Sequence, residues 1–154
     1  MEHSSKLYKD GNYRMSLLIG CGIFFGLRIS DLLQLSWDML LNDSSFEIIE
    51  KKTKKRREVR INKGFQKHIW DCYNALLITD KSEKCFKSRE RRVYSIQRIN
   101  MILKDIKKKY GLKSVKNFSS HSLKKQWVAM YMKEQILTEK WHWLCYLNCL
   151  TIAM

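Results

Sequence analysis

Apolar residues recur every three or four positions over three stretches of the chain. The first stretch covers residues 14–40, and the others cover 64–77 and 94–110. This spacing places the apolar side chains on one face of an α-helix, so the pattern predicts helices in all three stretches. Gly26 interrupts the first stretch and predicts a turn between two helices, of which the second carries Ile29, Leu32, Leu33 and Leu35.

A different pattern separates the first two helical stretches. Two short runs of β-favouring residues, 46–50 and 58–61, flank the basic sequence KKTKKRR. Such a pair predicts a β-hairpin, here with a strongly positive tip. Farther along, Ser119 or Ser120 is expected to cap a helix running through His121. The elements together predict a mainly α fold with one small antiparallel β-hairpin or sheet (α+β).

Size and composition indicate a single basic domain covering residues 1–154. The chain is 45% apolar and 12% aromatic, enough to build a core. Thirty Lys and Arg against fifteen Asp and Glu give a formal charge of +15. Because such an excess repels itself in a compact protein, a polyanionic partner is expected. Nucleic acid is the first candidate, and an anionic membrane surface is the second.

Five cysteines without a CxxC pair argue against a disulfide framework and favour a reducing compartment, so we expect a cytoplasmic protein. His142, Cys145 and Cys149 lie close enough to suggest metal ligands, but they lack a partner pair with zinc-site spacing. Buried structural cysteines are therefore the favoured interpretation, and no metal is expected. The apolar run from Met15 to Leu27 is too short to span a bilayer and is not followed by a cleavage site, which favours a buried core helix over an export signal.

Three segments carry residues suited to binding an anion. Arg28 stands at the start of a helix, where it is either a member of a surface ion pair, for instance with Asp31, or a functional side chain. The basic run after Glu50 is either a solvated charge run or an anion-binding hairpin tip. His121 and Lys124 are three positions apart and so share one face of the predicted helix, from which both can reach one anion.

The sequences of these segments and their order along the chain resemble those of the catalytic domain in the tyrosine recombinase (phage integrase) family. GLRISDLLQLSW, residues 26–37, resembles the first arginine motif, in which the arginine contacts the scissile phosphate. In the family a hairpin lysine in a KTxK setting donates a proton to the departing 5′ oxygen, and Lys52 matches it, with Lys51 as the alternate. SSHSLKKQW, residues 119–127, resembles the family's H-x-L-R box. The resemblance therefore implies Arg28, Lys52, His121 and Lys124 as catalytic residues, and Lys51, Lys54, Lys55, Arg56 and Arg57 as DNA-binding residues.

The resemblance also implies a reaction and its partners. In the family a tyrosine hydroxyl attacks a DNA phosphate and leaves a 3′-phosphotyrosine link, while positive donors stabilise the five-coordinate phosphate. No cofactor is needed, because the phosphodiester energy is kept in the covalent link. The expected partners are double-stranded DNA and other recombinase protomers, with no membrane and no small-molecule substrate. The expected setting is an integrase of a mobile element at the bacterial nucleoid.

The sequence departs from the family pattern at several positions. Lys124 stands where the family has its second arginine, and it keeps the charge but loses the fork that grips two oxygens. Cys149 stands where a histidine or tryptophan is usual, and the nucleophilic tyrosine is expected beyond Met154. Tyr131 and Tyr146 come too early to replace it and are interpreted as core aromatics. The family's N-terminal DNA-clamp domain would likewise precede residue 1.

The favoured hypothesis is a DNA-binding recombinase domain that is truncated and inactive as it stands. The alternative is a non-catalytic basic protein that binds nucleic acid through its lysine-rich surface. A third hypothesis keeps an active enzyme whose tyrosine comes from another chain.

Overall fold

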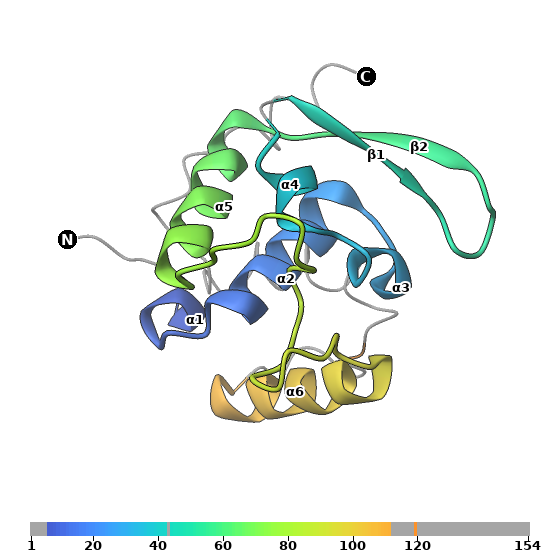
Figure 1. The fold of residues 1–154 in the computed structure, drawn as a ribbon. Helices are drawn as coiled ribbons and strands as arrows, with labels where there is room; N and C mark the ends of the chain where they lie inside the picture. Colours follow the sequence, from blue (N-terminus) through green and yellow to red (C-terminus); the bar gives the residue numbers. More distant parts are fainter. Residues whose placement is uncertain (1–5, 43, 112–118, 120–154) are drawn as a thin grey trace, which may run out of the picture.

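A computed structural model describes residues 6–42, 44–111 and 119 of the chain. Six helices and one antiparallel pair of strands make up the described part (Figure 1). The mainly helical architecture with one small β-hairpin confirms the predicted fold class. In chain order the elements are α1 (Lys6–Lys9), α2 (Tyr13–Phe25), α3 (Ile29–Leu32), α4 (Trp37–Leu40), β1 (Ser45–Ile49), β2 (Arg56–Arg60), α5 (Lys63–Ala75) and α6 (Ile96–Lys109).

Helix α2 lies at the centre of the core and packs against α5. The approach is close because Gly20 of α2 faces the ring of Phe65 on α5, where a Cβ atom would come within 2.5 Å of the ring. Phe24 stacks on the same ring, with 4.3 Å between centroids. Met15, Leu17 and neighbouring apolar residues are fully or almost fully buried. The apolar run is thus a core helix, as predicted, and among the described residues no helix is both long enough and apolar enough to cross a bilayer.

The turn predicted at Gly26 is present, but the helix after it is shorter than expected. Gly26 adopts a left-handed conformation with φ of 57°, which ends α2. The stretch that the sequence pattern assigned to one helix contains two helices of four residues, α3 and α4. They are separated because Ser36 leaves the helical path and forms an isolated β-bridge with Lys84. A long-range backbone contact has therefore overridden the helical periodicity.

The predicted hairpin forms, with Phe46 opposite Val59 and Ile49 opposite Arg56. Phe46, Ile48 and Val59 are buried, and the ring of Phe46 meets Phe25 of α2 edge to face at 5.3 Å. This apolar face holds one side of the hairpin on the core, while its far end extends away from the helices (Figure 1). The chain reverses between Glu50 and Lys55, with Lys54 at a positive φ of 56°.

Helices α5 and α6 form where the periodicity predicted them. Asn62 caps α5 by accepting a hydrogen bond from the backbone of Gly64, and Ser95 caps α6 by accepting one from Arg98. The C-terminal end of α6 is tied to the N-terminal region, because Lys109 and Tyr110 both bond the carboxylate of Asp10. Between the two helices, the backbone closes a turn over residues 88–92.

The described cysteines, Cys21, Cys72 and Cys85, are free and buried. Burial raises the pKa of each thiol above its usual value. This agrees with the structural role predicted for cysteines of this chain. His142, Cys145 and Cys149 lie outside the described residues.

Candidate active site

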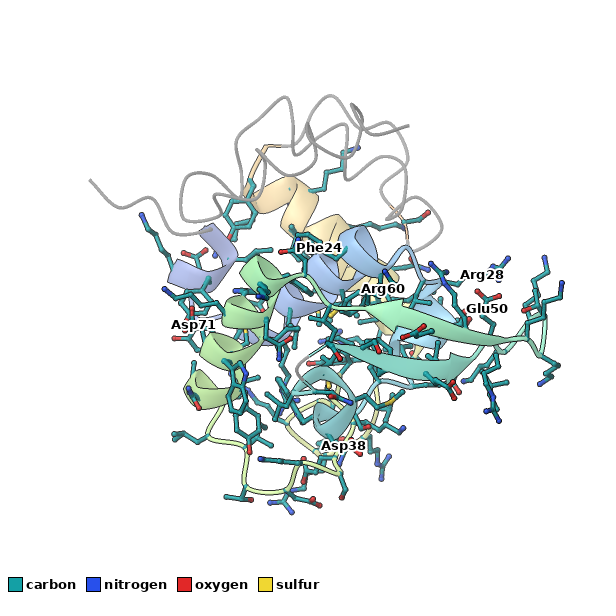
Figure 2. All side chains as sticks on the ribbon, turned by 90° about the horizontal axis from the view of Figure 1, so that it is seen from above. Phe24, Arg28, Asp38, Glu50, Arg60 and Asp71 are labelled. Carbon is teal, nitrogen blue, oxygen red and sulfur yellow. The ribbon has the colours of Figure 1, made fainter. Side chains whose placement is uncertain are left out.

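Arg28 occupies the short link between α2 and α3. The left-handed turn at Gly26 ends α2, Leu27 is buried, and Arg28 is extended at the N-cap of α3. Its side chain is 52% exposed and points away from the helices toward Glu50 (Figure 2). Glu50 and Lys51 form the start of the hairpin turn, which we name the hairpin base. The fold therefore presents a guanidinium group to solvent at a fixed helix end, as binding of an external anion requires.

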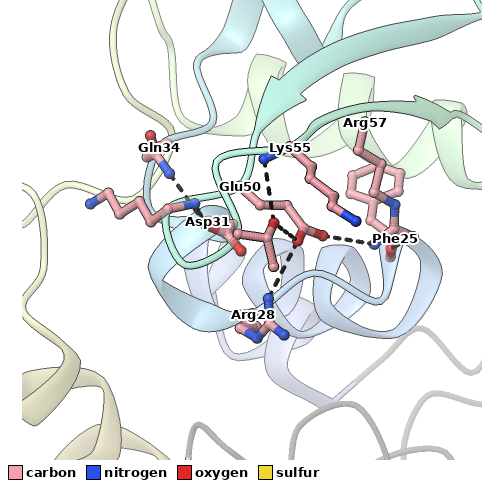
Figure 3. A network of polar contacts seen from close by, with 9 residues as sticks. Phe25, Arg28, Asp31, Gln34, Glu50, Lys55 and Arg57 are labelled. Atoms are coloured by element: carbon pink, nitrogen blue, oxygen red, sulfur yellow. Dashed lines mark hydrogen bonds and ion pairs between the residues drawn. The ribbon is translucent and has the colours of Figure 1, made fainter.

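The ion-pair partner of Arg28 is Glu50, the residue that follows β1. Arg28 Nη1 lies 3.4 Å from Glu50 Oε2, and Arg57 Nη1 lies 3.6 Å from Glu50 Oε1. The same carboxylate accepts a 2.7 Å hydrogen bond from Thr53 Oγ1 (Figure 3). The hydrogen bond from Thr53, together with the two guanidinium charges, holds the pKa of Glu50 below its usual value. Glu50 is therefore an ionised centre between the first arginine motif and the hairpin.

Asp31 forms the second link between α3 and the hairpin. Its side chain is fully buried, and Oδ1 accepts a 2.9 Å hydrogen bond from the backbone N–H of Lys51. The surface ion pair with Arg28 that the sequence suggested for Asp31 is therefore wrong, because Glu50 takes that place. The other oxygen, Oδ2, has no hydrogen-bond partner among the residues that the structure describes. Asp31 fixes the backbone directly before Lys52.

Lys52 lies in the turn at the end of the hairpin with an exposed side chain. Lys51, Lys54 and Lys55 are also exposed around this turn. Hydrogen bonds of 2.9 and 3.0 Å from Lys54 N to Glu50 O and from Glu50 N to Lys55 O close the turn. The fold thus brings the loop that carries Lys52 next to the helix that carries Arg28, although the two residues are 24 positions apart in the sequence.

Arg56 and Arg57 begin β2 and do not belong to the turn itself. Arg56 pairs with Glu47 across the hairpin at 3.3 Å, where both side chains are largely exposed. Arg57 turns back to the end of α2, where Nη2 donates a 3.0 Å hydrogen bond to the carbonyl of Phe25. Cations near a helix C-terminus are favourable because they bind its last carbonyl groups. Arg57 thus has a structural task within the chain.

The structure brings together only one half of the predicted site. Arg28 and the Lys52 turn share one region, whereas His121 and Lys124 lie outside the described residues. The sequence reasoning missed Glu50 and the buried role of Asp31. An acidic residue directly before a seven-residue run with six basic residues was the available signal for Glu50. No local pattern marks Asp31 as buried, because its hydrogen bond to Lys51 joins residues 20 positions apart.

Comparison with known proteins shows the family and the fold of this chain. The model of the phage integrase family matches residues 2–140. Among solved structures, a XerA recombinase crystal structure is similar with a TM-score of 0.63 and 18% sequence identity. The match covers 86% of this chain and 50% of that recombinase, so the chain spans half of its length. None of the curated proteins matches the chain. The structural likeness shows the fold, and the family model, which matches most of the chain, shows that the protein belongs to the phage integrase family of tyrosine recombinases.

Proposed function

We propose that this chain binds duplex DNA, with Arg28 contacting a backbone phosphate and the turn around Lys52 lying beside it. The observation that carries the proposal is the pairing of Arg28 with an ionised carboxylate at the base of a lysine-rich hairpin. A guanidinium group that already holds a carboxylate has the shape and charge to hold a phosphate. The formal charge of +15 supplies the attraction that brings a polyanion to this surface.

In the proposed chemistry, Arg28 stabilises negative charge on the five-coordinate phosphate. When the oxygen of a tyrosine hydroxyl bonds to phosphorus, the bond from phosphorus to the 5′ oxygen breaks and the hydroxyl proton passes to solvent. Lys52 supplies a proton to the departing 5′ oxygen. His121 and Lys124 complete the set of donors around the phosphate. Because Lys124 replaces an arginine, one bidentate contact is reduced to that of a single charge. Complete loss of such a donor would cost about 3 to 4 kcal/mol of transition-state stabilisation.

We further propose that the 154-residue chain by itself binds DNA without cleaving it. Lys124 and Cys149 stand where the family uses other residues, and both changes weaken the grip on the phosphate. A nicked suicide substrate tests this directly, because strand cleavage would trap the chain on DNA. The expected result is no covalent adduct on a denaturing gel, and an adduct would overturn the proposed inactivity. Adding a recombinase with an intact tyrosine would then show whether another chain supplies the nucleophile.

Binding itself is tested by measuring duplex affinity against salt concentration for the whole chain. We expect affinity to fall steeply between about 50 and 200 mM salt, because phosphate contacts release counterions. R28Q should reduce the slope of log K against log salt by about 1. R60Q is the matched control, because this substitution removes the same charge at an exposed residue. Arg60 lies at the end of β2 that is farther from the hairpin turn (Figure 2). Equal effects of the two variants would contradict a specific contact at Arg28.

The alternative is a non-catalytic basic protein that binds nucleic acid by its net charge. This alternative predicts that R28Q and R60Q reduce the salt dependence of binding equally. It also predicts similar affinity for single-stranded RNA and for duplex DNA of equal charge. A preference for the duplex that R28Q removes would favour the recombinase-type site.

A further inference from the structure

A second group of cations lies in the turn between α5 and α6. Arg89, Arg91 and Arg92 belong to the sequence SRERR at residues 88–92, which we name the arginine turn, and all three side chains are exposed. Their guanidinium groups make no hydrogen bond or ion pair with any residue of the described ranges. Glu90, in the middle of the turn, is the one carboxylate of this sequence. Exposed arginines without an internal counterion are a surface suited to an external polyanion.

The backbone of the arginine turn is fixed. Ser88 N donates a 2.7 Å hydrogen bond to Arg92 O, and Arg91 N donates one of 3.0 Å to Ser88 O. Lys87 and Val93 form an isolated antiparallel bridge behind these residues. Directly before the turn, Cys85 and Phe86 are completely buried in the core. The three arginines are therefore displayed on a closed turn with a buried anchor, which reduces the conformational entropy lost when they bind a ligand.

The arginine turn lines two adjoining concave surfaces. The first is a cleft of about 440 Å³ that includes Arg14, Arg89 and Arg91, and the second, of about 650 Å³, includes Arg89, Arg92 and Arg98. Arg14 is occupied by the carbonyl of Cys85 at 2.7 Å, and Lys87 by Glu83 at 3.5 Å. The guanidinium group of Arg98 is as free of described partners as those of the turn. The unoccupied charge of both clefts thus comes from arginines alone.

The arginine turn and the hairpin are attached to opposite ends of one short segment. At the start of this segment, Arg28 and Asp31 contact the hairpin. At its end, Leu35 O accepts a 2.9 Å hydrogen bond from Cys85 N, and Ser36 bridges Lys84. Arg28 and Leu35 are seven residues apart, so their separation is below about 25 Å. Arg89 is four residues beyond Cys85, so Arg28 and the arginine turn are at most about 45 Å apart. That distance corresponds to roughly 13 base pairs along a duplex, so one DNA molecule is long enough to meet both surfaces.

We propose that the arginine turn is a second phosphate-binding surface for the duplex that Arg28 contacts. Arg89, Arg91 and Arg92 bind backbone phosphates of the same duplex, within about 13 base pairs of the phosphate held at Arg28. The contacts are to the backbone, so they hold the duplex in register without reading its sequence. This inference rests on the proposed DNA-binding function and extends it to a surface with no part in the chemistry.

The test compares the whole chain with two triple variants on a 30-base-pair duplex of arbitrary sequence. R89Q/R91Q/R92Q removes three charges from the arginine turn, and K63Q/K67Q/K104Q removes three exposed charges from α5 and α6, outside both clefts. We expect the turn variant to reduce the slope of log K against log salt by about 2 to 3. The control should reduce it by less than about 1, because only long-range attraction is lost.

Arginine modification by phenylglyoxal, followed by mass spectrometry, gives a second readout on the unmutated chain. The duplex should protect Arg89, Arg91 and Arg92 from modification at low salt. Equal slopes for the two triple variants, or no protection of these arginines, would overturn the second surface. R28Q separates the two proposals: if R28Q lowers the slope and the turn variant does not, DNA binding at Arg28 stands and the arginine turn alone is refuted. No duplex binding by the unmutated chain would refute both.

Discussion

The two basic loops of this protein, the hairpin turn and the arginine turn, differ in the partners of their positive side chains. At the hairpin base, Glu50 holds Arg28 and Arg57, and Glu47 holds Arg56. At the arginine turn, the guanidinium groups have no carboxylate partner in the described part of the chain. A phosphate that binds at the hairpin base must compete with an internal anion, whereas one that binds at the turn meets no such competitor. Net charge alone therefore does not predict how readily a basic surface binds DNA.

The two loops also differ in how they are anchored. The arginine turn follows two buried apolar residues, and the base of the hairpin meets α3 through an ion pair and a buried hydrogen bond. The burial of large apolar side chains contributes more free energy than single polar contacts at a partly exposed surface. We therefore expect the turn to persist under conditions that release the hairpin base from α3.

The largest expected effect comes from removing the anchor of the arginine turn. F86A should lower the free energy of unfolding by about 3 to 5 kcal/mol, because it leaves a cavity at a completely buried ring. Urea unfolding followed by circular dichroism measures the change. V93A is the control, because Val93 forms an isolated bridge with Lys87, the residue after Phe86, but is 43% exposed. Its free energy of unfolding should stay within about 0.5 kcal/mol of the unmutated chain. Similar losses in both variants would contradict the anchoring role of Phe86.

Acid should weaken the core before it releases the hairpin. His68 is buried beside Ser16 and Cys72, and burial lowers the pKa of its imidazole to about 3. The unfolded chain takes up this proton near pH 6.5 and the folded chain does not. The stability that His68 contributes is therefore complete above pH 6.5 and is lost, by about 1.4 kcal/mol per pH unit, as the pH falls toward 3.

The pKa of Glu50 is lowered, so its pair with Arg28 stays ionised through the upper part of that range. The free energy of unfolding should therefore fall between pH 7 and pH 4.5. Over the same range, the amide of Lys51 should exchange hydrogen only when the whole chain unfolds, and not through local release of the hairpin base from α3. H68Q should flatten the pH dependence in this range, whatever its effect at pH 7. A slope unchanged by H68Q would contradict the assignment to His68.

Removing the buried acceptor of the hairpin base should have an intermediate effect. D31A leaves the N–H of Lys51 without its acceptor, which costs about 1 to 3 kcal/mol when the group remains buried. We expect faster hydrogen exchange at Lys51 and unchanged exchange at Ser88 and Arg91, whose amides donate hydrogen bonds within the arginine turn. D31N keeps an oxygen acceptor and should retain most of the protection. Loss of protection at both loops would show that they are not independently anchored.

The smallest expected effect is a gain of affinity. E50Q removes the internal competitor of Arg28 and should raise duplex affinity by about two- to fivefold at low salt, as for loss of a modest surface ion pair. E47Q removes an equal charge from the same strand pair without touching Arg28. Equal gains in affinity for E50Q and E47Q would show that net charge, and not the release of Arg28, causes the effect. A loss of affinity in E50Q would mean that Glu50 holds Arg28 in its binding position.

The sequence predicted those features that depend on local pattern. Helical periodicity located α2, α5 and α6, and the β-favouring runs around KKTKKRR located the hairpin. The motif around Arg28 led to the family that the comparison confirmed. These predictions succeed because residues close together in the sequence determine the local backbone geometry. They also determine which side of a helix or strand is buried.

The tertiary structure decided which charges face each other. Glu50 meets Arg28 because the hairpin lies against α3, and the buried carboxylate of Asp31 accepts a hydrogen bond from the backbone of Lys51, 20 positions away. The predicted helix after Gly26 is split into α3 and α4 because Ser36 pairs with Lys84, 48 positions away in the sequence. The sequence alone left the basic run after Glu50 as either a solvated surface or an anion site. Contacts between distant segments, which no local periodicity encodes, assign some of those cations to internal carboxylates. The arginine turn has no carboxylate partner within the described part of the chain.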